Sequence, residues 1–296
     1  MIIKRYSAFL LTLVVSAFSM SAQTASFLNV PDDAKDLGMG GVSFVRDAEC
    51  VLDETSLNAD FSYFRWSPKG VGTNLIDVDI NYSFGKIGIF GEARMNGYAS
   101  YPMFDGMGNG TGEYKPNEMM AGIGAAYAIT DGLAVSVLAK YVGSSLAPEA
   151  KANAFCADVN LLYRNKDLTV GLLAANLGSS LDFGTAKVAL PMAVKAGAAY
   201  DLGLGENFGL QLGLDAGYMA QSGHNAVVAS AGADLKMFDI ASVRAGYHFS
   251  SNTAFDPSYI SAGLGVDVSV ISISAAYLFG PSPMSGTLCA AIGVRF

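Results

Sequence analysis

The segment IDVDINYSF, residues 76–84, alternates strictly between apolar and polar side chains. Ile76, Val78 and Ile80 share one parity, and Asp77 and Asp79 take the other. Because successive side chains of a β-strand point to opposite faces, this segment predicts a strand with one apolar and one acidic face. Such a strand suits a sheet that has lipid on one side and a polar interior on the other.

The same alternation recurs along the chain to its last residue. We expect about fourteen antiparallel strands, most of which reach the roughly 9–11 residues that a tilted membrane-spanning strand needs. Strands of soluble sandwiches are usually shorter, about five or six residues, so the lengths favour an all-β transmembrane barrel. The expected strands cover residues 59–67, 73–84, 86–98, 116–129, 132–143, 149–164, 167–176, 188–201, 206–218, 225–236, 239–250, 257–268, 270–279 and 286–296.

The connections between these strands alternate between short and long. Turns such as FGK (84–86) and NKD (165–167) follow every second strand, whereas long segments such as 99–115 and 250–259 follow the others. Short turns at one end and longer loops at the other are typical of outer-membrane β-barrels, whose short turns face the periplasm. With an even number of strands, we expect both termini in the periplasm.

The composition agrees with a barrel rather than with membrane helices. The chain of 296 residues is 51% hydrophobic and only 15% charged, against about 25% charged in an ordinary soluble domain. No run of 18 apolar residues occurs beyond the first twenty or so positions, so a multi-helix membrane protein is excluded. The net charge of −8 argues against a nucleic-acid partner. For a transmembrane barrel, outer-membrane lipid is the expected surrounding.

The first 22 residues have the organisation of a signal peptide. Lys4 and Arg5 precede the apolar run AFLLTLVVSAF, residues 8–18, and small residues follow it. We place cleavage after Ala22, with Ser21 as the alternative, and expect an exported protein in the outer membrane of a Gram-negative bacterium. The expected organisation is therefore a signal peptide (1–22), an N-terminal periplasmic or plug segment (23–58) and a transmembrane barrel (59–296).

The three cysteines are too far apart for a zinc or redox motif. Cys50, Cys156 and Cys289 are interpreted as small buried residues of the barrel, with one intramolecular disulfide as the alternative.

Polar residues on the inward parity are the candidate lumen residues. They either pair across the wall and hold a plug, or select a permeant. The set comprises Asp77, Asp79, Glu92, Arg94, Lys140, Asp158, Arg164, Arg244 and His248.

An embedded hydrolase would need a nucleophile, a base and an acidic partner. The only histidines are His224, in a loop, and His248, on the inward parity, and no acidic orienting residue is evident beside His248. The loop segment DGMGNGTGE (105–113) lacks the spacing of a calcium-binding loop. We therefore expect no catalytic residues, no metal and no cofactor.

The stretch DAKDLGMGGVSFV, residues 33–45, fits neither of the common phosphate-binding fingerprints. No Lys follows its glycines, and Phe44 stands where the dinucleotide pattern needs a third glycine. A barrel of fourteen strands encloses a lumen that its own side chains do not fill. We therefore expect this stretch to fill the lumen as a plug or hatch, with Leu37, Gly38, Met39, Gly40 and Gly41 close to the wall.

The segment AKDLGMGGVSFVRDAE (34–49) resembles the amino-terminal motif of the PorV/PorQ proteins of the type IX secretion system, and SLNADFSYFRWSP (56–68), with Asn58 and Ala59, is similar to the segment that follows it there. The resemblance implies a fourteen-stranded barrel similar to the FadL transporters. It also implies an accessory role in protein secretion or surface attachment, with secretion components or secreted proteins bearing C-terminal signal domains as partners. The alternative is a FadL-like transporter or channel for hydrophobic small molecules.

The longest loop, residues 101–114, carries exposed apolar side chains such as Phe104 and Met107. It is expected either to contact a partner or incoming lipid, or to be a mobile surface loop.

Overall fold

The computed structural model describes residues 24–45, 47–52, 57–67, 72–281 and 284–296, and the expected signal peptide lies outside them. Fourteen antiparallel strands form one closed barrel, as the alternation predicts. The first and last strands of the barrel complete the circle, with Asn58 opposite Arg295 and Phe64 opposite Cys289. Closure leaves no unpaired sheet edge along the barrel, which is the condition for a β-structure to span a membrane.

The observed strands differ from the expected ones mainly by a few residues at their ends. They are β1 (Leu57–Trp66), β2 (Thr73–Phe84), β3 (Ile87–Gly97), β6 (Asn117–Thr130), β7 (Leu133–Ala147), β8 (Ala150–Asn165), β9 (Leu168–Gly178), β12 (Met192–Gly203), β13 (Phe208–Gln221), β14 (His224–Met237), β15 (Ala241–Ser250), β16 (Tyr259–Val268), β17 (Ile271–Phe279) and β18 (Leu288–Arg295). The two largest differences are at the end of β7, which extends to Ala147 rather than to residue 143, and at the start of β12, which begins after Pro191 rather than at residue 188. At β12 the reason is that proline has no N–H for the ladder.

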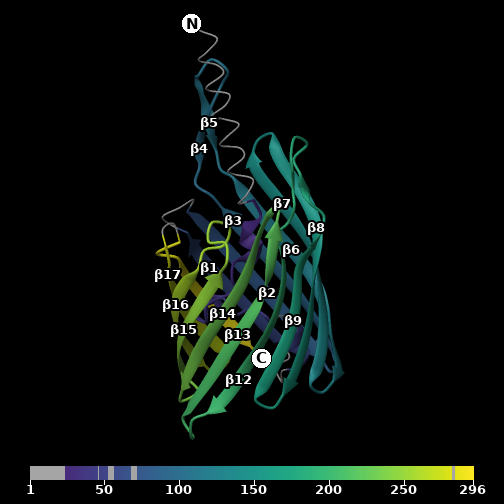
Figure 1. The fold of residues 1–296 in the computed structure, drawn as a ribbon, viewed down its shortest axis with the longest axis vertical. Helices are drawn as coiled ribbons and strands as arrows, with labels where there is room; N and C mark the ends of the chain where they lie inside the picture. The colour runs from purple at the N-terminus through teal and green to yellow at the C-terminus, as the bar shows by residue number, and fades with distance from the viewer. Residues whose placement is uncertain (1–23, 46, 53–56, 68–71, 282–283) are drawn as a thin grey trace.

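Two of the expected loops contain small hairpins. Strands β4 (Tyr101–Phe104) and β5 (Gly110–Tyr114) pair with each other, and so do β10 (Leu181–Asp182) and β11 (Lys187–Val188). The β4–β5 hairpin rises well beyond the barrel wall (Figure 1). Its base is tied to β7, because Tyr101 donates a hydrogen bond to Leu146 O and Tyr114 OH lies 2.7 Å from Ser145 Oγ. The segment 101–114 is therefore an ordered hairpin and not an unstructured loop.

The alternation of the sequence becomes an outer apolar face and an inner face. Ile80 and Leu212 are about half exposed on the outside, at 51% and 44%, whereas Asp77 is 1% exposed on the inside. We call the end with the turn between β2 and β3 the short-turn end, and the opposite end, which bears the β4–β5 hairpin, the long-loop end.

The lumen is filled by an N-terminal plug, defined as residues 24–45 and 47–52. It contains η1 (Ser26–Asn29), α2 (Ala34–Gly38) and η2 (Asp47–Val51). Asp33 caps α2 by accepting a hydrogen bond from Asp36 N. None of the helices in the described residues is long and apolar enough to cross a membrane.

The plug runs from the long-loop end to the short-turn end. Ala25 N donates to Glu118 at the long-loop end of β6, while Glu49 pairs with Arg164 near the short-turn end of β8. The C-terminal Phe296 lies at the short-turn end, where its carbonyl oxygen accepts from Leu57 N. The described chain thus starts and ends at opposite ends of the barrel. The N-terminus itself lies outside the described residues, so the placement of both termini in the periplasm stays a prediction.

The cysteines form no disulfide in the described chain. Cys156 and Cys289 are buried free thiols on the inner face, and Cys50 is buried against Gly88 of β3. With two of the three thiols free, the alternative of an intramolecular pair is wrong.

Candidate functional site: the plugged lumen

The glycine turn of the plug lies directly on the barrel wall. Gly40 and Gly41 have φ of +79° and +76°, a conformation that glycine adopts without strain. A Cβ on Gly40 would lie 2.5 Å from Tyr247 N, and a Cβ on wall residue Gly246 would lie 2.1 Å from the carbonyl carbon of Met39. Two backbones therefore meet with no room for a side chain on either of them.

Hydrogen bonds hold this turn in place. Ser261 Oγ accepts from Gly40 N at 3.0 Å and donates to Gly38 O at 3.2 Å. Leu37 and Met39 are buried, at 0% and 4% exposed. All five residues from 37 to 41 are buried between plug and wall.

Further along, the plug is bound through its backbone. Ser43 N donates to Asp215 Oδ2 at 2.7 Å, and Ser43 Oγ accepts from Lys195 Nζ at 2.7 Å. Asn160 Nδ2 donates to Phe44 O at 3.0 Å. These wall residues come from β8, β12 and β13, which lie on one arc of the barrel with β9 between β8 and β12, so this part of the plug is held against that arc.

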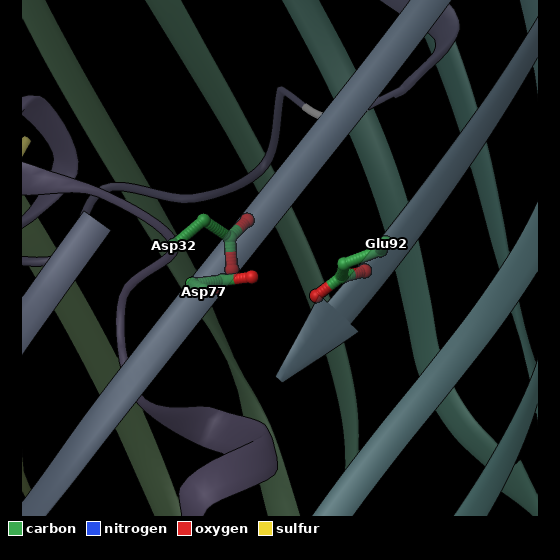
Figure 2. A group of neighbouring side chains, drawn as sticks. All are labelled: Asp32, Asp77 and Glu92. Atoms are coloured by element: carbon green, nitrogen blue, oxygen red, sulfur yellow. The ribbon is translucent and has the colours of Figure 1, made fainter. Parts of the chain in front are cut away.

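Arg94 is the centre of the most charged contact between plug and wall. Its Nε lies 2.6 Å from Asp77 Oδ2 and 2.8 Å from Glu92 Oε1, and its Nη2 pairs with Asp32 of the plug. Its Nη1 also donates to Val30 O at 3.0 Å. Figure 2 shows the three carboxylates turned toward one another, from the plug, β2 and β3. The guanidinium supplies the positive charge that this group of carboxylates requires.

The other predicted lumen residues also form pairs. Lys140 Nζ lies 2.6 Å from Asp158 Oδ1 and donates to Asn176 Oδ1, which sits where β9 shifts register against β8. Arg244 pairs with Asp234 at 3.0 Å, and Arg164 pairs with Glu49 of the plug. The four predicted lumen cations, Arg94, Lys140, Arg164 and Arg244, thus pair with carboxylates, and two of the pairs join wall to plug.

His248 has an acidic partner that the sequence does not reveal. Its Nε2 lies 2.7 Å from Asp256 Oδ2 and its Nδ1 lies 3.0 Å from Ser230 Oγ. The expectation of no acidic orienting residue is therefore wrong, because Asp256 reaches back from the loop between β15 and β16. Tyr259 stacks on the ring with centroids 4.9 Å apart. The imidazole is thus occupied at both nitrogens and on one face.

A cavity of about 170 Å³ lies beside the plug in the short-turn half. Acidic side chains from three neighbouring strands meet there, since Asp60 is opposite Asp79 and Asp79 is opposite Glu92. Asp32, Asp33 and Glu49 of the plug complete the acidic lining. Like charges directly opposite one another are unfavourable in a sheet, so this wall has been built at a cost in stability.

The long-loop half of the lumen contains extensive apolar clusters, which sequence reasoning missed. Its inward-facing side chains form two buried clusters, and the plug residues Ala25, Phe27, Leu28 and Val30 belong to the first of them. The wall residues include Phe64, Leu75, Met120, Val142, Leu173, Ala193, Met219, Val228, Leu278 and Cys289. The signal for this half is an apolar residue on both parities at the strand ends next to the long loops, as in FSYFRW (61–66).

Comparison with solved structures finds the same fold in outer-membrane transport proteins. The toluene transporter TbuX of Ralstonia pickettii has a TM-score of 0.58 at 12% identity, with 91% of this chain and all of that chain covered. The toluene transporter TodX of Pseudomonas putida has 0.57 at 12% identity over 89% and 97% of the chains. The monoaromatic hydrocarbon channel CymD has 0.58 at 11% identity over 90% and 98%.

No protein-family model and no curated protein matches the sequence. At these low identities the likeness establishes the fold alone. The fold defines the class: a plugged, fourteen-stranded β-barrel of the outer-membrane type, similar in architecture to a FadL homologue of Pseudomonas aeruginosa.

Proposed function

We propose that the protein is a passive outer-membrane channel for hydrophobic small molecules, closed in this state by its N-terminal plug. The observation that carries the proposal is the apolar lining of the long-loop half. There Phe27, Leu28 and Val30 of the plug share one buried cluster with wall residues such as Phe64 and Met120. A second buried apolar cluster of the wall contains Leu173, Met219 and Val228. A water-filled porin has a polar interior, so such a lining is unsuited to hydrophilic solutes and suited to apolar ones.

The plug explains how such a path stays closed without a permeant. The apolar residues of the plug make the contacts that an apolar molecule would make in their place. The molecule and the plug therefore compete for the same surface, and binding of the molecule favours release of the plug. The similarity of fold to channels and transporters for monoaromatic hydrocarbons supports this class of permeant. Toluene is accordingly the first compound to test, with the long-loop end taken as the outer side.

Uptake of radiolabelled toluene by cells that lack their own uptake channels tests the proposal. Expression of the protein should raise the initial rate of uptake, and Val228→Asn, which places an amide in the apolar lining, should lower it. Gln211→Asn, an inward polar change near the short-turn end of β13, is the matched control and should leave the rate unchanged. An equal rate with and without the protein would contradict the proposal.

A role in type IX secretion is the alternative, and it rests on the resemblance of residues 34–49 to the PorV/PorQ motif. It predicts that deletion of the gene leaves secreted proteins unprocessed or absent from the surface while uptake of apolar compounds is normal. The channel proposal predicts the reverse pair of results, so one deletion strain separates the two.

A further inference from the structure

Glu118 is a fully buried carboxylate that has no cationic partner among the described residues. It is 0% exposed and lies at the long-loop end of β6. Its oxygens accept hydrogen bonds from Tyr98 OH at 2.6 Å, Ser144 Oγ at 3.0 Å and Ala25 N at 2.9 Å. Other buried carboxylates of the lumen, such as Asp158 and Asp234, pair with a Lys or an Arg. A buried carboxylate without a countercharge is unfavourable, and a cation bound beside it would offset that cost.

The neighbouring Gln221 lacks a donor for its side-chain oxygen. Its Nε2 donates to Thr24 O at 2.6 Å, while its Oε1 is buried without a hydrogen-bond partner in the described part of the chain. Asn96, which is opposite Glu118 on β3, likewise has a buried Oδ1 without a donor. Buried polar atoms are almost always paired, so these two side-chain oxygens can accept hydrogen bonds from a donor that the described residues do not supply.

Both Glu118 and Gln221 hold the very start of the plug. Thr24 is 2% and Ala25 0% exposed, so the chain is already enclosed by the wall at this point. Signal-peptide removal after Ala22, as the sequence predicts, would leave Gln23 as the first residue. The new amino group would then be two residues before Ala25 in the chain, and a chain spans at most about 3.3–3.6 Å per residue.

We propose that Glu118 and Gln221 form a binding site for the α-ammonium group that signal-peptide removal creates at the N-terminus of the plug. That group brings one positive charge and several N–H donors to a place that offers one uncompensated carboxylate and an unpaired amide oxygen. The precursor has an amide bond at this position and cannot form the ion pair. Processing therefore completes the attachment of the plug at the long-loop end, whatever the permeant of the barrel.

Protection of the amino group from chemical modification tests the site. Mature protein purified from outer membranes is treated with an amine-modifying reagent at neutral pH, and the N-terminal peptide is quantified by mass spectrometry. An ammonium ion beside an opposite charge gives up its proton less readily, so the folded wild type should react roughly tenfold more slowly than Glu118→Gln. Glu113→Gln, an exposed carboxylate of the β4–β5 hairpin, is the control and should react like the wild type.

A second variant leaves the wall untouched in case Glu118→Gln fails to assemble. Two residues, Gly-Ser, are inserted between Ala22 and Gln23, which moves the new amino group away from Glu118 while cleavage still follows Ala22. This variant should lose the protection and should have a lower thermal midpoint than the wild type. In the inserted background, Glu118→Gln should produce no further loss of protection.

Two outcomes would overturn the proposal. One is a wild-type amino group that reacts as fast as in either variant. The other is a mature N-terminus, found by sequencing, that begins beyond Ala25, since no amino group would then lie near Glu118 and Gln221.

Discussion

The two halves of the lumen are built by the same strands and filled by the same plug, yet their chemistry differs. In the long-loop half, Phe27 and Leu28 of the plug pack against apolar wall residues such as Met120. Where the two halves meet, Asp32 of the plug pairs with Arg94, which is opposite Met120 in the wall. Toward the short-turn end the wall presents a row of acids that includes Glu92, Asp79 and Asp60. The comparison shows that alternation determines which side chains face inward, while the polarity of the inward face varies along the barrel axis.

This difference suggests separate roles for the two halves. An apolar half can receive a molecule that leaves water or lipid, whereas a charged half binds such a molecule poorly and favours its release. The plug is held by packing in the first and by charge in the second. Changes in each half are therefore expected to respond differently to salt and pH.

The largest effect is expected when the plug is removed. Deletion of residues 26–50 should turn a protein that conducts little in planar bilayers into one with a steady conductance, because a fourteen-stranded barrel is wider than its own side chains fill. The open channel should prefer cations, since Asp60, Asp79 and Glu92 then face water. A large, stable conductance of the intact protein would show that the plug does not close the lumen.

In the charged half, Arg94→Gln should release the plug. The change leaves Asp32, Asp77 and Glu92 close together without their shared guanidinium, and removal of one partner from a buried charge network costs about 3–5 kcal/mol. Hydrogen exchange of plug amides should rise accordingly, and acidification, which adds protons to carboxylates, should restore part of the protection. Arg295→Gln, at an exposed position by the short-turn end, is the control and should change little. Unchanged hydrogen exchange of the plug amides in Arg94→Gln would show that this charge network does not hold the plug in place.

In the apolar half, Leu28→Ala should loosen the plug by packing alone. Leu28 is 5% exposed within the apolar cluster, and truncation of a buried Leu typically costs about 2–5 kcal/mol. Exchange of plug amides should increase to a similar degree at low and high salt. A strong dependence on salt or pH would mean that the two halves are not chemically distinct in the way described.

The barrel could be predicted from the sequence, because a period of two and a regular sequence of loop lengths are local signals. The plug glycines could also be placed, since Gly38, Gly40 and Gly41 fit a backbone that lies against a wall. The apolar half was missed because inward parity was equated with polarity, although Phe64 and Leu75 lie on that parity.

The alternation of apolar and polar residues could not predict contacts between distant segments. Asp256 lies in a long loop, and only the path of that loop brings it to His248. Asn176 faces inward because β9 shifts register against β8, a property of the strand pair rather than of either sequence. The direction of the plug depends in the same way on Glu118 and Gln221, which are remote from residues 24 and 25 in sequence.

The smallest effect is expected at the glycine turn, where the two halves join. Gly40→Ala and Gly184→Ala form a matched pair, because the two glycines have φ of +79° and +81° and so share the backbone strain of a substitution. They differ in surroundings: the new Cβ would lie 2.5 Å from Tyr247 N at Gly40, whereas nothing lies within 4 Å at Gly184, in the surface hairpin between β10 and β11.

Subtraction of the Gly184→Ala effect therefore isolates the contact between plug and wall, which overpacking should weaken by about 1–3 kcal/mol. Hydrogen exchange should report the loss in plug amides on both sides of residue 40, since a turn pushed from Tyr247 also loses the bonds of Ser261 to Gly38 and Gly40. Equal effects of the two substitutions would mean that the plug yields at this turn without cost, and the close approach of Gly40 to the wall would then have no part in keeping the lumen closed.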